Sequence, residues 1–166
     1  MTKYLLRGMT DEDLPAVLRL DQELFPEDAW SEEMFRGELA DQPRTRHYVI
    51  AESGDREIIG YAGLSAAGGQ ADVQTIGVRT GWRGAGIGAA LLTELLDEAA
   101  RRASEAVFLE VRADNDSARR LYERFGFERV GVRKRYYQPS NVDAIVMRRE
   151  LRAVRRAPVG FSREQS

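Results

Sequence analysis

The chain of 166 residues carries 25 basic and 27 acidic side chains, a net charge of −2, a single histidine and no cysteine. This length suits one domain with a substantial hydrophobic core, and the mildly acidic charge balance disfavours nucleic acid as a partner. The lack of cysteine excludes disulfides, thiolate nucleophiles and cysteine-ligated metals. One histidine excludes a histidine-rich metal site within a single chain, so we expect no bound metal.

The N-terminal part predicts a short strand followed by two helices. Residues 3–7 form the strand, and Thr10 precedes three carboxylates at 11–13 that favour a helix start through the helix dipole. Residues 25–30, with the sequence FPEDAW, end this first helix, and Ser31 caps the second. The buried face of the first helix is expected to contain Leu14, Val17 and Leu18.

The next part predicts three strands. Residues 47–52 and 57–64 flank a hairpin turn at 53–55, and a turn at 66–69 precedes a strand at 72–78. His47 opens the first of these strands, so we interpret it as a residue at a strand edge and not as a chemical group.

A long amphipathic helix is predicted over residues 86–103, before a strand at 106–112. Two ion pairs with i,i+4 spacing are expected on its polar side, Asp97–Arg101 and Glu98–Arg102. Its apolar stripe comprises Ile87, Leu91, Leu92, Leu95, Leu96 and Ala99.

A further helix, capped by Asn115 or Asp116 and ended by Gly126, leads to strands at 127–134 and 144–151, which flank a long loop at 136–143. This element order predicts a mixed α/β (α+β) fold in a single domain over residues 1–151. Residues 152–166 are basic and then polar, and we expect them to form a flexible tail.

Membrane and export signals are not apparent in the sequence. No apolar run reaches the roughly 18 residues of a membrane span, and the N-terminus lacks the apolar stretch of a signal peptide. We therefore expect a cytoplasmic protein without a membrane partner.

The most informative segment is 73–92, VQTIGVRTGWRGAGIGAALL, which predicts a strand, a glycine-rich turn and a helix start. Glycines let the backbone approach a ligand closely, and the free N–H groups at the start of a helix favour a phosphate. Gly84, Gly86 and Ala89 match the dinucleotide pattern G-x-G-x-x-G/A, with a carboxylate, Glu110, about twenty residues later.

Context argues against a dinucleotide. Such a fold needs several βαβ units and usually opens on its glycine-loop strand, whereas here that strand follows two helices and a hairpin. The same turn contains R-x-x-G-x-G, with Arg83, Gly86 and Gly88, and resembles the acyl-CoA pyrophosphate loop of the GCN5-related N-acetyltransferase (GNAT) family. A glycine-rich turn without any ligand is the plain alternative.

The resemblance extends beyond this turn. TIGVRTGWRGAGIGAALL, FLEVRADNDSARRLYERFGF and RKRYYQPSNVDAIVMRREL, together with Trp30-Ser31-Glu32 after Phe25-Pro26, are similar to the RimI type of this family, the N-α-acetyltransferases of ribosomal-protein N-termini. About three quarters of the chain is covered. The resemblance implies the GNAT fold, with a central mixed, mostly antiparallel sheet flanked by helices, and acetyl-CoA as co-substrate.

The resemblance also implies how acetyl-CoA binds. Backbone groups of a strand pair with the pantetheine arm, amides of the glycine turn hold the pyrophosphate, and an asparagine contacts CoA. The residues in these positions are Ile76, Gly77, Val78, Arg83, Gly84, Ala85, Gly86, Ile87, Gly88, Ala89 and Asn115. Read without the resemblance, Asn115 is a helix cap and Arg83 a solvated loop charge.

Glu110 and Tyr122 are the catalytic candidates. Strand alternation places Glu110 on one face with Phe108 and Arg112, which by itself suits a solvated carboxylate paired with Arg112. The resemblance instead implies a general base at Glu110 and, at Tyr122, an acid that protonates the departing CoA thiolate. A phenol with a pKa of about 10 is protonated at neutral pH, although Tyr122 also fits a core position on its helix.

Substrate contacts are expected from residues 25–31 and 136–143, with Trp30, Tyr136 and Tyr137 as the contacting side chains. An acidic cluster in and after the first of these segments would attract a basic substrate, but we favour roles in helix-dipole stabilisation and solubility. The cluster comprises Glu27, Asp28, Glu32 and Glu33.

The leading hypothesis is direct transfer of the acetyl group to the N-terminal α-amine of a protein, such as a ribosomal protein, aided by a backbone N–H near Val78 that polarises the thioester oxygen. At pH 7 roughly a tenth of an α-amine is neutral, against about 0.04 per cent of a lysine, which makes the N-terminus the easier nucleophile. A lysine or small-amine acetyltransferase is the alternative. A non-catalytic acyl-CoA-binding module would need the glycine turn but neither Glu110 nor Tyr122.

Overall fold

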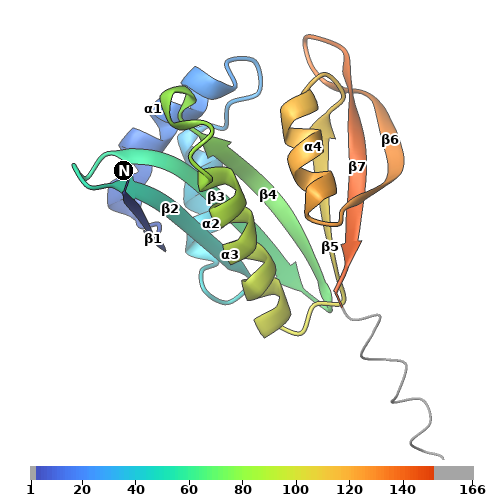
Figure 1. Ribbon diagram of the computed structural model, residues 1–166, viewed down its shortest axis with the longest axis horizontal. Helices are drawn as coiled ribbons and strands as arrows, with labels where there is room; N and C mark the ends of the chain where they lie inside the picture. The colour runs from blue at the N-terminus through green and yellow to red at the C-terminus, as the bar shows by residue number, and fades with distance from the viewer. Residues whose placement is uncertain (1–2, 152–166) are drawn as a thin grey trace, which may run out of the picture.

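The chain folds around one seven-stranded sheet with α1 and α2 on one face and α3 and α4 on the other (Figure 1). The computed structural model describes residues 3–151, so the expected tail at 152–166 lies outside the described residues. Its elements are β1 (Tyr4–Gly8), α1 (Leu14–Leu24), α2 (Glu32–Ala40), β2 (Arg46–Ser53), β3 (Ile58–Ala67), β4 (Gln70–Val78), α3 (Ile87–Arg101), β5 (Ala106–Arg112), α4 (Asp116–Arg124), β6 (Glu128–Tyr137) and β7 (Val142–Glu150). Among these residues, no helix is long and apolar enough to cross a membrane.

The strands lie in the order β1-β2-β3-β4-β5-β7-β6, and every neighbouring pair is antiparallel except β4 and β5. The expected mixed, mostly antiparallel sheet is therefore confirmed. The prediction of a long loop at 136–143 is wrong. Strand β6 continues to Tyr137, which pairs with Val142, and only residues 138–141 form the turn. The Asp143 carboxylate accepts a hydrogen bond from the backbone N–H of Arg135 at 2.8 Å, which helps to hold these strand ends together.

Two hydrophobic clusters cover the two faces of the central strands, which explains why the run HYVIAE in β2 is mostly apolar. Val49 and Ala51 belong to the cluster under α3, whereas Tyr48 and Ile50 pack with α1 and α2, as strand alternation requires. The predicted stripe of α3 is confirmed, since all its members are buried in the first cluster.

Helix α1 begins later than the sequence predicts. Residues 11–13 form a 3-10 turn, in which the Asp13 carboxylate accepts a hydrogen bond from the Thr10 N–H at 2.9 Å. Leu18, expected on the buried face, is only half-buried. The buried residues of α1 are Leu14, Val17, Leu20 and Asp21.

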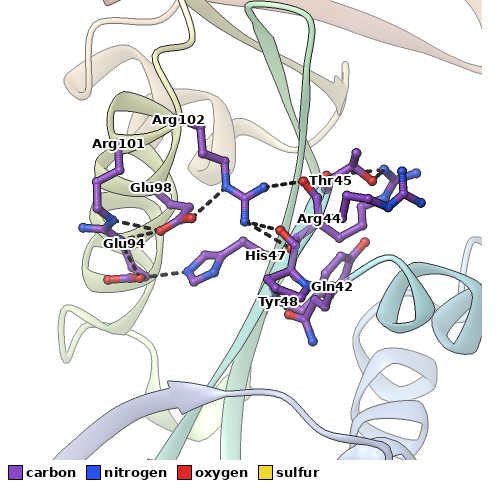
Figure 2. Close-up of polar contacts among 11 residues, drawn as sticks. Gln42, Arg44, Thr45, His47, Tyr48, Glu94, Glu98, Arg101 and Arg102 are labelled. Atoms are coloured by element: carbon purple, nitrogen blue, oxygen red, sulfur yellow. Dashed lines mark hydrogen bonds and ion pairs between the residues drawn. The ribbon is translucent and has the colours of Figure 1, made fainter.

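An ionic network fastens the end of α3 to the segment that leads into β2 (Figure 2). Arg102 donates to Glu98 at 2.7 Å, which confirms one of the two predicted i,i+4 pairs. The same guanidinium donates to the backbone carbonyls of Pro43 at 2.8 Å and Arg44 at 3.1 Å. Arg102 therefore satisfies acceptors of a turn that lies far away in the sequence.

The other prediction, an ion pair between Asp97 and Arg101, is wrong. Arg101 contacts Glu98 at 2.7 Å and Glu94 at 3.3 Å, because residues three and seven positions earlier also lie on its side of the helix. His47, the second residue of β2, contacts Glu94 at 2.9 Å, an interaction that the sequence did not suggest (Figure 2). His47, Glu94 and Glu98 offer ligand atoms within 4.8 Å of one another, but the arginines already supply the positive charge that an ion would bring.

The pairing of β4 with β5 is short, and the two strands separate beyond it. Gln70–Asp72 pair with Ala106–Phe108, and no further pairs follow. Two consecutive residues of β3 face Val73 and Thr75, so Gln74 is an extra residue on β4. Because such a bulge bends its strand, β4 diverges from β5 and the sheet opens between them (Figure 1).

Gly77 of β4 lies where no side chain fits. A Cβ atom there would lie 2.7 Å from the ring and hydroxyl of Tyr61, which is fully buried, and 2.9 Å from Leu24. We expect Gly77→Ala to lower the free energy of unfolding by about 1–3 kcal/mol, measured by urea denaturation. Gly37→Ala in α2, where a methyl group meets nothing within 4 Å, is the control and should stabilise by up to about 1 kcal/mol. An unchanged midpoint for Gly77→Ala would show that Tyr61 and Leu24 can rearrange.

Candidate active site

A cavity of about 610 Å³ occupies the opening between β4 and β5. Residues 73–78 and 109–112 form two of its walls, and the remainder comes from the glycine turn, α4 and the segment between α1 and α2. Most of the predicted site residues line it: Trp30, Ile76, Gly77, Val78, Arg83, Gly84, Gly86, Ile87, Gly88, Ala89, Glu110, Asn115, Tyr122 and Tyr137. Ala85 borders an adjoining hollow, and Tyr136 lies outside the lining of both.

The glycine turn presents backbone N–H groups at the start of α3. Gly84 and Gly86 have φ angles of +88° and +84°, a region that other residues rarely adopt, and Gly86 is the N-cap of the helix. A Cβ on Gly88 would lie 3.5 Å from Leu121 of α4, an ordinary van der Waals distance, so packing against α4 alone does not require glycine at this position. The free amides and the helix dipole make this end of the cavity suitable for an anionic group.

The two polar side chains beside the turn have local hydrogen bonds. The Asn115 side chain accepts from the N–H of Ala118 at 3.2 Å, so its role as the cap of α4 is confirmed. The exposed Arg83 side chain donates weakly to the carbonyl of Val78 at 3.5 Å. Neither contact occupies the turn amides.

The backbone of β4 offers hydrogen-bonding groups to the cavity. The N–H of Arg79 donates to the carbonyl of Ile59 in β3 at 2.8 Å. Because N–H groups alternate between the two edges of a strand, those of Ile76 and Val78 point away from β3 and toward the opening.

Glu110 extends from β5 into the cavity, but its partner is not Arg112, the one that strand alternation alone suggested. Arg133 of β6 donates to its Oε2 at 2.6 Å. The expected partner, Arg112, instead contacts Asp28 at 2.8 Å and Asp114 at 3.0 Å. The sequence could not indicate Arg133, because β6 reaches β5 only across the intervening strand β7.

Tyr122 is both a core residue and a cavity residue. Its ring is buried and packs edge-on against Phe127 at 5.9 Å, while part of it lines the cavity. Burial and the nearby Tyr137 hydroxyl raise the pKa of Tyr122 well above its usual value. Its hydroxyl therefore stays protonated at neutral pH and can act only as a proton donor.

The two tyrosines of β6 differ in position. Tyr137 lines the cavity, and burial together with the charge of Glu110 raises its pKa to about 12. Tyr136 is 42% exposed, and its ring lies beneath the guanidinium of Arg133 at 4.3 Å. Burial, together with the charge of Glu110 and a hydrogen bond to it, raises the pKa of Tyr136, so this side chain lies beside Glu110 as well as Arg133.

Asp21 is a functional position that the sequence analysis missed. It is buried on α1 and accepts hydrogen bonds from the Trp30 N–H at 2.8 Å and the Tyr61 hydroxyl at 2.5 Å. Burial raises the pKa of Asp21 despite these two donors. The signal was present, because Asp21 lies seven residues after Leu14 on the apolar stripe of α1, where a carboxylate requires partners.

Asp28 joins the segment between α1 and α2 to β5 through its contact with Arg112. Both side chains are about four-fifths buried, and Arg112 also lies over the ring of Tyr137 at 5.3 Å. The interpretation of Asp28 as a helix-dipole or solubility residue is therefore wrong. Glu32 and Glu33 do lie in the first turn of α2, where that interpretation holds.

A model of the Acetyltransferase (GNAT) family matches residues 14–127. The chain belongs to this family. The acyl-CoA interpretation of the glycine turn is thereby favoured over the dinucleotide one, since GNAT acetyltransferases use acetyl-CoA.

Several relatives are similar over most of the chain. The N-alpha-acetyltransferase RimI of Mycobacterium tuberculosis is 45% identical over 148 residues, which cover 86% of this chain and 90% of that protein. The ribosomal protein bS18-alanine N-acetyltransferase of Escherichia coli (strain K12) is 32% identical over 146 residues, or 86% and 94% of the two chains. The crystal structure of the Escherichia coli ribosomal-protein-S18-alanine N-acetyltransferase has a TM-score of 0.77 at 27% identity, covering 89% and 94%. The resemblance to the RimI type is confirmed.

The Asp28–Arg112 contact should hold the segment between α1 and α2 in place. Removing it in Asp28→Ala should cost about 1 kcal/mol locally, so the backbone amides of Asp28 and Trp30 should exchange hydrogen about fivefold faster. Glu27→Ala is the matched control, because Glu27 is exposed and lies 3.9 Å from Arg112. Equal exchange in both variants, measured by mass spectrometry, would mean that Asp21 alone holds the segment.

Proposed function

We propose that this protein transfers the acetyl group of acetyl-CoA directly to the N-terminal α-amine of a protein, with a ribosomal protein as the leading candidate. Similarity to enzymes named for N-α-acetylation and for ribosomal-protein alanine acetylation supports this substrate class. A ribosomal-protein substrate would place the reaction in the cytoplasm. The observation that carries the proposal is the cavity, which brings Glu110, Tyr122 and outward-facing amides of β4 around one space.

The glycine turn suits the pyrophosphate of acetyl-CoA, because its free amides lie at the positive end of α3. The outward N–H groups of Ile76 and Val78 suit the peptide-like pantetheine arm. One of them, near Val78, would stabilise the negative charge that develops on the thioester oxygen during attack. The other residues assigned to acetyl-CoA are Gly77, Arg83, Gly84, Ala85, Gly86, Ile87, Gly88, Ala89 and Asn115.

The acceptor amine must lose a proton before it can attack. Glu110 accepts this proton, directly or through water. The amine nitrogen then bonds to the carbonyl carbon, the carbon–sulfur bond breaks, and the nitrogen releases its second proton to solvent as the amide forms. Tyr122 protonates the departing thiolate and regains a proton from solvent, and Glu110 returns its proton to solvent. No side chain carries the acetyl group, so the rate gain comes mainly from positioning.

Trp30 and Tyr137 line the cavity and are assigned to the first residue of the acceptor. Tyr136, expected to contact the acceptor, lies outside the cavity lining beside Arg133 and Glu110, so we assign it to support of Glu110. An N-terminal amine is favoured over a lysine, because its neutral fraction at pH 7 is about two-hundred-fold greater.

CoA release from acetyl-CoA should occur with peptides that have a free N-terminus and no lysine, and not with N-blocked twins that contain a lysine. Glu110→Gln should slow turnover at neutral pH by about a hundredfold while leaving acetyl-CoA affinity unchanged. Glu123→Gln, on the exposed side of α4, is the matched control.

Full activity of Glu110→Gln would remove Glu110 from the mechanism. Turnover on the lysine twin alone would move the assignment to a lysine acetyltransferase. No turnover on either peptide, with acetyl-CoA still bound, would leave a small-amine enzyme or a binding module.

A further inference from the structure

We propose that Arg133 cancels the charge of Glu110 so that a bound acceptor ammonium can give up its proton. This makes Arg133 a positioning residue for the reaction, and the inference rests on the proposed function only in requiring an amine acceptor. The family model matches residues 14–127 and ends before Arg133, which opens the segment RKRYYQPSNVDAIVMRREL that resembles the RimI type.

Arg133 is held in place by two contacts. Its Nη1 donates to Glu110 Oε2 at 2.6 Å, and its guanidinium lies 4.3 Å from the centre of the Tyr136 ring. Arg133 is in register with Ala144 of β7, and Ala144 is in register with Arg112 of β5. The small side chain of Ala144 lets Arg133 reach across β7 to the carboxylate on β5.

The other polar groups around Glu110 do not provide a second balancing cation. Arg112, on the same strand, is already bonded to two carboxylates, and the residue opposite Glu110 on β7 is the apolar Val146. Asp72 of β4 adds negative charge, and the Glu110 charge together with burial raises its pKa. The charged and titratable groups facing Glu110 are Arg133, Tyr136 and Tyr137 of β6, Asp72 of β4, Arg112 of β5 and Asp28.

Without a neighbouring positive charge, the carboxylate of Glu110 would stabilise the protonated form of the acceptor amine, which cannot attack. A negative charge close to an ammonium raises its pKa by about one unit or more. An α-amine with a pKa near 8 would then be only about one per cent neutral at pH 7, against roughly ten per cent otherwise. A guanidinium on one carboxylate oxygen removes this penalty. Because the same guanidinium stabilises the ionised carboxylate, Glu110 passes the proton on to solvent and does not retain it.

The decisive variant is Arg133→Gln, for which binding and turnover should change in opposite directions. With CoA present in place of acetyl-CoA, a peptide with a free N-terminus should bind about fivefold to tenfold more tightly at pH 7, measured by calorimetry. An N-blocked twin should bind as it does to the unchanged protein. With acetyl-CoA, kcat at pH 7 should fall about tenfold, because the bound amine is held protonated.

The pH profile separates this role from a structural one. The acid limb of kcat should move up by about one unit in Arg133→Gln, and the two proteins should reach the same kcat near pH 10, where the amine is neutral in both. Arg133→Lys should restore most of the activity at pH 7, since it keeps the charge. Arg129→Gln, an exposed arginine on the same strand, should leave binding and kcat unchanged.

Three results would overturn the inference: an equal loss of kcat at every pH, a rise of kcat at pH 7, or unchanged affinity for the free N-terminus. The same calorimetric comparison with methylammonium chloride needs no peptide acceptor and no turnover. If the unchanged protein fails to acetylate any peptide, the proposed function fails. The effect of Arg133→Gln on methylammonium affinity would still decide this inference.

Discussion

The parallel pairing of β4 and β5 stops after three residue pairs, and the whole site depends on that early divergence. If the pairing continued, the outward N–H groups of Ile76 and Val78 would bond to β5, and Glu110 would pack against a neighbouring strand. The extra residue Gln74 turns β4 away, so backbone donors and a carboxylate face the same cavity. In a regular sheet, neighbouring strands bond to each other's backbone N–H and C=O groups. Here the bulge leaves the outward N–H groups of Ile76 and Val78 without a neighbouring strand.

Two carboxylate–guanidinium pairs lie beside this cavity and have different roles. Asp28 and Arg112, 84 residues apart, join the segment between α1 and α2 to β5. Both side chains are mostly buried, so their contact mainly fixes the position of that segment. Glu110 and Arg133 are more exposed, and in the proposed reaction their net charge matters more than their rigidity. Arg133 balances Glu110, and Arg112 is shared by Asp28 and Asp114, so arginines offset the carboxylates on both sides of the cavity.

Local features of the sequence predicted much of this structure, because helix caps, strand alternation and glycine turns depend on residues close together in the chain. The stripe of α3, the Ser31 and Asn115 caps and the end of α4 before Gly126 all follow from such spacing. Predictions failed where partners come from distant elements. Arg133, and not Arg112, pairs with Glu110, which the sequence could not indicate because β7 lies between β5 and β6. Arg101 contacts Glu94 and Glu98 and not Asp97. Asp21 was overlooked although a carboxylate on an apolar stripe indicates a buried polar contact.

Asp21 also links the two sides of the cavity. Its carboxylate accepts hydrogen bonds from the Trp30 backbone on one side of the cavity and from the Tyr61 hydroxyl, and the Tyr61 ring lies against Gly77 of β4 on the other side. The segment around Trp30 therefore cannot shift far without disturbing a buried tyrosine or the β4 backbone. A site supported in this way is largely formed before its substrates arrive. Discrimination between amines must then depend less on closure of a loop than on which acceptor nitrogen can be neutral beside Glu110. The neutral fraction of that nitrogen depends on the acceptor's own pKa and on the charges around it.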